Sequence, residues 1–246
     1  MFLTRFQVNP RRRDSSKLLA SPQVMHAAVL SSFPDAMAAP GDPGRVLWRL
    51  DRLGGKLLLI IASPKKPDLT HLVEQAGWPS LEPAWETRDY APLLERIVAG
   101  QRWAFRLTAN PIHSLPPVNG KRGRVLGHRT VEHQLGWLVG RSEQHGFSLV
   151  EHDAQQLNAA TEELVSVTVP TARVTNSQVL RFARGASTVT LRSATFDGLL
   201  EVIDAEVFKH ALTSGIGSGK AYGCGLLTIA PHLPTAAGAS IVPVSS

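Results

Sequence analysis

A glycine-rich segment near the end of the chain carries the clearest chemical signal in the sequence. Five glycines fall within eleven residues and enclose Lys220. Glycines at this density predict a loop whose backbone adopts positive φ or packs closely against a neighbouring group. Exposed backbone N–H groups beside a lysine suit a phosphate, so the segment also predicts a phosphate contact. The five glycines are Gly215, Gly217, Gly219, Gly223 and Gly225.

The spacing in this segment does not match the known nucleotide-binding loops. The P-loop pattern G-x-x-x-x-G-K-[ST] follows a strand and opens a helix. Aligned on Lys220, this chain has Ser214 in place of the first glycine and Ala221 in place of the Mg²⁺-binding hydroxyl. The dinucleotide pattern G-x-G-x-x-G also fails, because Lys220 occupies the position of the third glycine. The backbone of a nucleic acid is therefore a better prediction than a nucleotide.

The charge balance also indicates an anionic partner. The chain has 26 lysines and arginines against 20 acidic residues, a net charge of +6 and a pI of about 9.9. A basic balance favours nucleic acid, although runs of charge are usually solvated faces. Lys121, Arg122 and Arg124 lie in an expected loop before a helix and fit a track of phosphates.

The sequence offers little to hold a metal ion. His128, Glu132 and His133 give H-x₃-E-H, which is neither H-E-x-x-H nor H-x-x-E-H, and we interpret them as the solvated start of a helix. Cys224 is the only cysteine, which excludes an internal disulfide and a thiolate zinc site, and we expect it to be a small packed residue. No metal and no cofactor are expected.

Composition places the chain among globular proteins. It has 246 residues, of which 43% are hydrophobic. The first residues lack an apolar run long enough for a signal peptide. The longest aliphatic run, residues 57–62, is too short to span a membrane. We therefore expect a cytoplasmic protein with no membrane partner.

The elements that must position these residues follow one order twice. Hydrophobic alternation, turn signals and helix caps predict β-α-β-β-α-β in each half, which is the ferredoxin-like unit. The first half is expected to have strands at 2–8, 46–51, 56–63 and 93–98, helices at 22–33 and 67–76, and a loop at Arg11 to Arg13. The second half is expected to have strands at 102–108, 164–169, 189–196 and 226–229, helices at 130–145 and from Asp204, and a polar excursion at 171–187.

The predicted fold class is therefore α+β, with two tandem ferredoxin-like domains. We expect the first domain at residues 1–98 and the second at 99–231. The residues from 232 to 246 are small, polar and proline-bearing, and are expected to form a disordered tail.

Seven short motifs follow one another along residues 1 to 231. They are Asn9-Pro10, Met25-His26, Leu47-Trp48-Arg49-Leu50, the segment from Phe105 to Pro111, Gly120-Lys121-Arg122, Gly136-Trp137-Leu138 and the segment from Gly215 to Leu227. Together and in this order they resemble CasE, the CRISPR RNA-processing endoribonuclease family of type I-E systems.

The resemblance implies an activity, partners and a catalytic residue. Members of this family cut the CRISPR precursor transcript at the base of each repeat stem-loop without a metal ion, leave a 2′,3′-cyclic phosphate and remain on the product as a subunit of the surveillance complex. Their catalytic histidine corresponds to His26. Some members have a tyrosine three residues earlier, where this chain has Gln23, which could bind the scissile phosphate or position His26.

The resemblance also implies how the RNA is held. A hairpin at the place of the polar excursion enters the groove of the RNA stem in this family, so Arg181 and Arg184 are expected to contact RNA, as is Lys220. A-form stems are recognised mainly through shape, phosphates and 2′-hydroxyls. Two alternatives stay open: a non-catalytic stem-loop-binding subunit of the same fold, and a general two-histidine ribonuclease unconnected with CRISPR.

Overall fold

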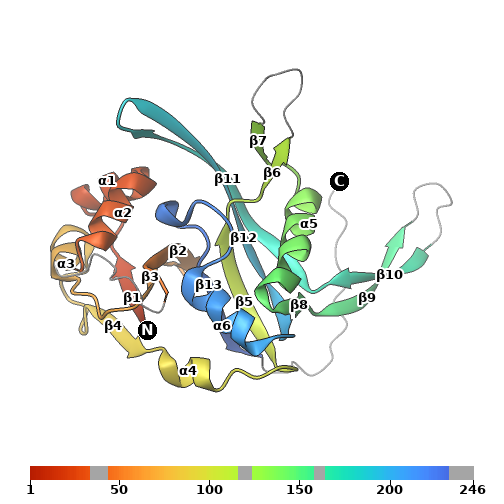
Figure 1. Cartoon of the computed structure of the whole chain (residues 1–246). Helices are drawn as coiled ribbons and strands as arrows, with labels where there is room; N and C mark the ends of the chain where they lie inside the picture. Colours follow the sequence, from red (N-terminus) through yellow and green to blue (C-terminus); the bar gives the residue numbers. More distant parts are fainter. Residues whose placement is uncertain (34–43, 116–123, 158–163, 233–246) are drawn as a thin grey trace.

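The chain forms two large antiparallel sheets, each with helices on one face (Figure 1). The computed structural model describes residues 1–33, 44–115, 124–157 and 164–232. Two further two-stranded sheets, β6–β7 and β9–β10, project from the second large sheet. In the part of the chain that is described, no helix is long and apolar enough to cross a membrane.

The first sheet has the strand order β2-β3-β1-β4, which is the ferredoxin-like order expected from the sequence. Ser21 starts the helix α2 by accepting a hydrogen bond from the backbone N–H of Val24, and Pro22 fits the first turn because it lacks an N–H. The elements are β1 (Phe2–Val8), α1 (Arg13–Ala20), α2 (Pro22–Leu30), β2 (Leu47–Leu53), β3 (Lys56–Ser63), α3 (Thr70–Ala76), β4 (Trp85–Asp89) and α4 (Ala91–Glu95).

Two expectations for this half are corrected. Arg11 and Arg12 form a turn, as expected, but Arg13 already begins the helix α1, which the sequence did not predict. This helix forms because Leu18 is buried in the first core and Ser15 donates a hydrogen bond to the carbonyl of Asn9. The strand expected at 93–98 is also wrong. The edge strand is β4, which pairs with β1. The chain then turns into α4, at whose start Asp89 accepts a hydrogen bond from the backbone N–H of Ala91 and a proline occupies the first turn.

The second sheet has the order β11-β12-β5-β13, the same arrangement with its second strand split in two. Both β8 and β11 pair with β12, at opposite ends, and the β9–β10 ribbon separates them in the chain. The elements are β5 (Arg102–Ala109), β6 (Ile112–Leu115), β7 (Arg124–Gly127), α5 (Val131–Ser142), η1 (Glu143–His145), β8 (Phe147–Leu149), β9 (Glu151–Leu157), β10 (Leu164–Pro170), β11 (Ala172–Arg184), β12 (Ser187–Val202), α6 (Ala205–Ser214), η2 (Lys220–Tyr222) and β13 (Leu227–Pro231).

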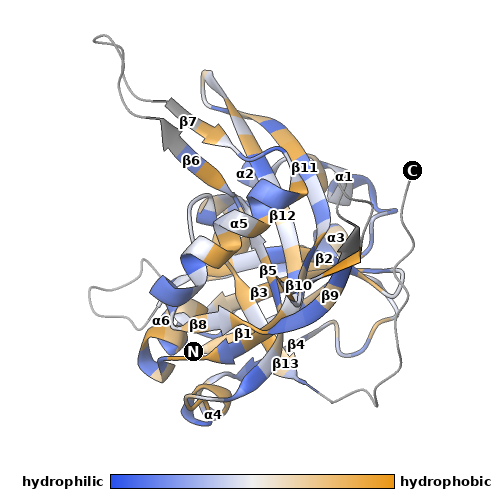
Figure 2. Cartoon of the chain, turned by 90° about the vertical axis from the view of Figure 1, so that its right-hand side faces the viewer, coloured by the Kyte–Doolittle hydropathy of each residue, from blue (hydrophilic) through white to orange (hydrophobic). Residues whose placement is uncertain are grey.

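The polar excursion expected at 171–187 is mostly the long strand β11. It pairs with β12 into a hairpin that extends beyond the sheet, on the same side of the molecule as the β6–β7 hairpin (Figures 1 and 2). Polar side chains occupy both faces of this hairpin, so the hydrophobic contrast that reveals a half-buried strand is missing. The strand expected at 164–169 is present as β10, but it belongs to the β9–β10 ribbon rather than to the main sheet.

The helices α5 and α6 cover one face of the second sheet, and its other face turns toward the first half. The covered face forms a core in which Phe196 stacks on Trp137 and Phe147 contacts Phe208. On β5, Leu107 points into this core, whereas Arg106 and Thr108 point to the opposite side. The strand β5 therefore turns polar side chains toward the first half.

Arg49 on β2 joins the two halves. Its Nε and Nη2 donate to the two carboxylate oxygens of Asp51, each at 2.8 Å. Its Nη1 donates to the carbonyls of Arg106 and Leu226, and its Nη2 also donates to Thr228. Arg49 is 2% exposed, and a charge at that depth needs such a complete set of partners. One side chain thereby ties β2 of the first sheet to β5 and β13 of the second.

Candidate active site

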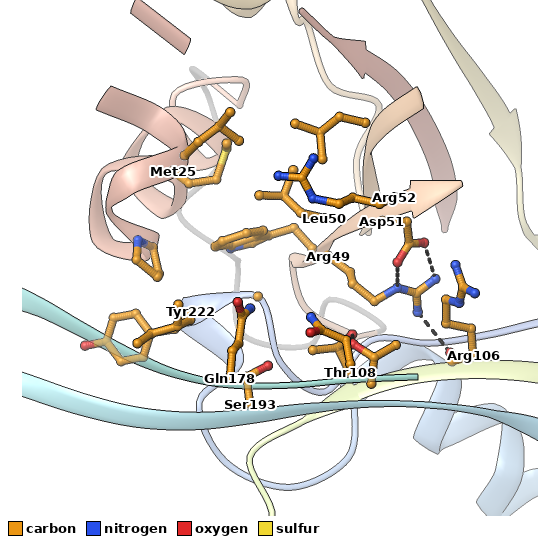
Figure 3. A pocket seen from close by; sticks show the side chains of 18 of the residues that line it. Met25, Arg49, Leu50, Asp51, Arg52, Arg106, Thr108, Gln178, Ser193 and Tyr222 are labelled. Carbon is orange, nitrogen blue, oxygen red and sulfur yellow. Dashed lines mark hydrogen bonds and ion pairs between the residues drawn. The ribbon is translucent and has the colours of Figure 1, made fainter. Parts of the chain in front are cut away.

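A cleft of about 490 Å³ lies between the helix α2 with the strand β2 on one side and the open face of the second sheet on the other (Figure 3). Met25 and Trp48 line it from the first half. Thr108, Gln178 and Ser193 line it from the sheet, so hydroxyl and amide groups face the apolar residues of α2 and β2. This arrangement can bind a ligand that has both polar and apolar parts.

His26 lies on α2 at the edge of this cleft. It follows Met25, and its Nδ1 accepts a hydrogen bond of 3.3 Å from Nε1 of Trp48. The ring is half-buried, and this burial, followed by the charge of Arg45, lowers its pKa from the ordinary value. Because an indole nitrogen can only donate, the neutral ring in this contact carries its proton on Nε2.

Two cationic side chains belong to the neighbourhood of His26. The charge of Arg45 lowers the pKa of both His26 and Lys220, after the larger effect of burial on each. Nζ of Lys220 donates a hydrogen bond of 2.8 Å to the carbonyl of Ser214, the last residue of α6. Lys220 therefore stabilises a helix end and also contributes positive charge beside the cleft.

Gln23 lies one turn before His26 on α2. The spacing of three residues places both on one helical face, as expected from the sequence. Gln23 is half-buried. Its amide is therefore available on the same face as the imidazole, and its contact with a phosphate stays a prediction.

The glycine-rich loop has the backbone that its composition predicts. All five glycines have positive φ, between 76° and 90°. A Cβ atom on Gly223 would lie 2.8 Å from the ring of Trp48, so the loop packs directly on the residue that bonds His26. Within the loop, Cys224 is fully buried beside Phe182 and Leu191, which confirms the expectation of a small packed residue.

The predicted RNA-binding arginines of the long hairpin lie on opposite faces. On β11, Leu180 lines the cleft of His26 and Val179 does not, and the strand alternates regularly from there. Arg184 therefore shares the face of Leu180, whereas Arg181 shares the face of Val179. Both arginines are exposed.

The remaining basic residues predicted from the sequence are not placed. Lys121 and Arg122 lie outside the described residues. Arg124 begins β7, and its side chain lies outside them as well.

The histidines before α5 are not simply a solvated helix start. His128 is half-buried, and its ring stacks on that of His133 and contacts the tilted ring of His113. Among residues 1–33, 44–115, 124–157 and 164–232, no group of three or more histidine, cysteine or acidic side chains is placed to hold a metal ion.

Sequence reasoning gave no role to Trp48 or to Arg45. Trp48 looks like an ordinary core residue of a strand, and it is only 3% exposed. Its indole N–H donates to His26 of α2, a contact between residues far apart in the sequence that no local pattern predicts. Arg45 follows a proline- and glycine-rich stretch and has no pattern of its own.

Comparison with known proteins places this architecture in one family. A family model described as CRISPR-associated protein matches residues 1–231. The CRISPR-associated endoribonuclease Cse3 of Thermus thermophilus is 29% identical over 239 residues, which cover 94% of this chain and all of that protein.

Solved structures agree with this assignment. Thermus thermophilus Cse3 bound to an RNA representing a pre-cleavage complex has a TM-score of 0.70 and 28% identity, over 94% of this chain and 98% of that one. A chain of a CRISPR RNA-guided surveillance complex in a pre-nicking state shares the fold, with a TM-score of 0.60 and 22% identity over 94% and 99% of the two chains. The chain belongs to the CRISPR-associated protein family, as its resemblance to CasE predicted.

Proposed function

We propose that the protein is an endoribonuclease that processes CRISPR precursor RNA. It cuts at the base of the repeat stem-loop, needs no metal ion, leaves a 2′,3′-cyclic phosphate and stays on the product as a subunit of a type I-E surveillance complex. The observation that carries this proposal is the position of His26, half-buried at the edge of a polar cleft and close to the charge of Arg45. The similarity to Cse3, an endoribonuclease with RNA-bound structures, supports it.

The proposed reaction is a transfer within the RNA. The 2′-oxygen forms a bond to phosphorus while the bond between phosphorus and the 5′-oxygen breaks. The 2′-hydroxyl proton passes to a base, and the leaving 5′-oxygen receives a proton from an acid. His26 suits either transfer because imidazole titrates near neutral pH.

The other groups of the site act on the charge of the phosphate. Negative charge grows on the phosphate oxygens as the transition state forms, and fixed positive groups stabilise it. Arg45 and Lys220 supply such charge, and the Gln23 amide can donate a hydrogen bond to the same oxygens. No phenol stands at position 23, so the second proton transfer falls to a group other than a tyrosine there.

Cleavage of the cognate repeat RNA in the presence of EDTA tests the proposal. We expect full activity with the chelator and a 3′ end that acid converts from a cyclic to a linear phosphate. His26→Ala should lower the rate by about 10²- to 10⁴-fold, the usual contribution of positioned acid–base catalysis, and leave hairpin affinity nearly unchanged.

The matched control is His152→Ala, which removes an exposed histidine on β9. A 3′-hydroxyl product, or inhibition by EDTA that Mg²⁺ reverses, contradicts metal-free transfer. Binding without any cleavage would identify the protein instead as a stem-loop-binding subunit. Equal cleavage of unrelated hairpins would favour a general ribonuclease.

A further inference from the structure

A second cavity, of about 910 Å³, lies on the other face of the second sheet. Strand alternation separates it from the cleft of His26. On β11, Gln178 lines the first cleft and Val179 lines the second cavity. On β12, Ser193 lines the first and Arg192 the second. The sheet therefore stands between this cavity and the proposed cleavage site.

Three histidine rings form one wall of the cavity. The ring of His128 lies 4.7 Å from that of His113 on β6 and 5.8 Å from that of His133 on α5, measured between centroids. Nδ1 of His133 is 2.7 Å from Oγ1 of Thr130, which fixes the orientation of that ring. The backbone carbonyl of His128 accepts a hydrogen bond from the side chain of Gln134, so the backbone that carries the central ring is also fixed.

Two arginines complete the cavity. Arg192 packs tightly on Gly127 of β7, where a Cβ atom would lie 2.9 Å from Cβ and 3.1 Å from Cδ of that arginine. Gly127 has no positive φ, so close approach and not backbone conformation explains the glycine. Arg129 lines the same cavity. On β11, Arg181 pairs with Thr190, another lining residue, and so extends this positive face along the hairpin.

The chemistry of these side chains favours an anion. No aspartate or glutamate is among the described residues that line the cavity. Burial, and then the neighbouring charges of His113 and His133, lowers the pKa of His128. A bound anion would relieve this repulsion and let the imidazoles take up protons. A metal ion suits the site poorly, because the rings face one another instead of converging their nitrogens, and two guanidinium groups repel a cation.

We infer that the cavity formed by His113, His128, His133, Arg129 and Arg192 is a phosphate-binding site separate from the His26 cleft. We call it the histidine pocket. Its ligand is a phosphate group, either of an RNA strand or of a free nucleotide. The RNA source rests on the proposed function, whereas the phosphate chemistry does not. A strand held here lies on the opposite face of the sheet from the scissile bond, so it belongs to another part of the RNA.

Phosphate binding at the histidine pocket should be coupled to proton uptake by the histidines. The charged groups that face His128 are His113 from β6, Arg129 from the preceding loop, His133 from α5 and Arg192 from β12. The strand β11 contributes the uncharged Val179. Because a phosphodiester keeps one negative charge between pH 6 and pH 8, a rise in affinity toward pH 6 would come from the histidines.

The test follows the histidine ring signals by NMR during titration with two probes, a short unstructured RNA with hydroxyl ends and adenosine monophosphate. We expect the signals of His113, His128 and His133 to shift together. The RNA should bind about tenfold more tightly at pH 6 than at pH 8, and calorimetry in two buffers should show proton uptake. Shifts with the RNA assign the pocket to an RNA strand, and shifts with the mononucleotide alone assign it to a free nucleotide.

Variants locate the effect. Arg192→Gln and His128→Asn should each weaken binding at pH 6 about tenfold, the usual cost of one charged contact. The control His145→Asn removes a half-buried histidine after α5 that does not line the cavity, and it should change nothing. The inference is overturned if neither probe moves the three ring signals, if affinity is equal at both pH values, or if Zn²⁺ binds stoichiometrically there. These readouts need no cleavage, so an inactive protein would refute the proposed function and leave this site standing.

Discussion

At the scale of single residues, the contact between Trp48 and His26 decides the chemistry of the candidate site. The indole N–H occupies Nδ1 of the imidazole, so a doubly protonated ring would bring two N–H groups together. Trp48 therefore opposes the charged form of His26, in the same direction as its burial. Trp48 is a positioning residue: it sets the tautomer of the group proposed to act on the RNA and acts on its pKa in the same direction as burial and Arg45.

Trp48→Phe should raise the pKa of His26, because the aromatic packing remains while the indole N–H that disfavours a protonated Nδ1 is lost. The pH dependence of cleavage should move to higher pH by the same amount, whether His26 acts as acid or as base. NMR titration of the ring and a pH–rate profile measure the two effects.

The control is Trp137→Phe, which removes a buried indole N–H that has no hydrogen-bond partner among the described residues. It should leave the pKa of His26 unchanged. An unaltered His26 pKa in Trp48→Phe would show that the 3.3 Å contact does not hold the ring in solution.

At the scale of elements, the glycine-rich loop and the long hairpin were visible in the sequence to very different degrees. The loop was predictable because positive φ at five positions requires glycine, and the composition shows that directly. The close contact of this loop with the ring of Trp48 was not predictable, because it depends on how β2 packs against the loop. The strand β11 of the hairpin was missed because polar, exposed side chains occur on both of its faces, whereas its partner β12 was predicted over 189–196.

Gly223→Ala should destabilise the protein by about 2 to 4 kcal/mol, because the new methyl group meets the Trp48 ring and the backbone is also strained. Gly54→Ala is the control. Its φ is 55°, but no atom lies within 4 Å of the added Cβ, so only strain of about 1 kcal/mol remains. Chemical denaturation measures the stability of both variants. Equal losses of stability would show that the contact with Trp48 does not explain the glycine at position 223.

Arg181 and Arg184 should differ in their effect on RNA binding, because they lie on opposite faces of the hairpin. If the RNA stem rests on one face, replacing the arginine of that face by alanine should reduce the slope of log affinity against log salt concentration by at most about one unit. Replacing the arginine of the other face should reduce this slope much less. Affinity measured against salt for the two single variants tests this. Equal losses would mean that the RNA wraps around the hairpin edge.

At the scale of the whole molecule, the two halves are tied together by the buried side chain of Arg49. Arg49 and Asp51 come from the same strand, and the guanidinium also reaches the carbonyls of Arg106 and Leu226 on the second sheet. The repeated β-α-β-β-α-β order was predictable from hydrophobic periodicity in each half. The way the halves meet was not, because a lone arginine in an alternating strand resembles any solvated residue.

Arg49→Met should cost about 3 to 5 kcal/mol, because it leaves Asp51 buried without a partner. The double variant Arg49→Met with Asp51→Leu should recover part of this loss. It should not recover all of it, because two backbone carbonyls of the second half lose the guanidinium as a donor. Urea denaturation of both variants measures the difference. A double variant no more stable than the single one would show that bonds to the second sheet, and not the ion pair, carry the stabilisation.

The buried Cys224 gives this protein a chemical reporter of its own. It is the only thiol in the chain. It is a fully buried residue of the glycine-rich loop, and this burial raises its pKa to about 12. An alkylating reagent can therefore react only in molecules whose loop has transiently opened. The rate of labelling under native conditions measures how often that opening occurs, without any engineered probe. If RNA rests on the loop, saturating RNA will protect the thiol, and the degree of protection will give the energy that the RNA adds to loop closure.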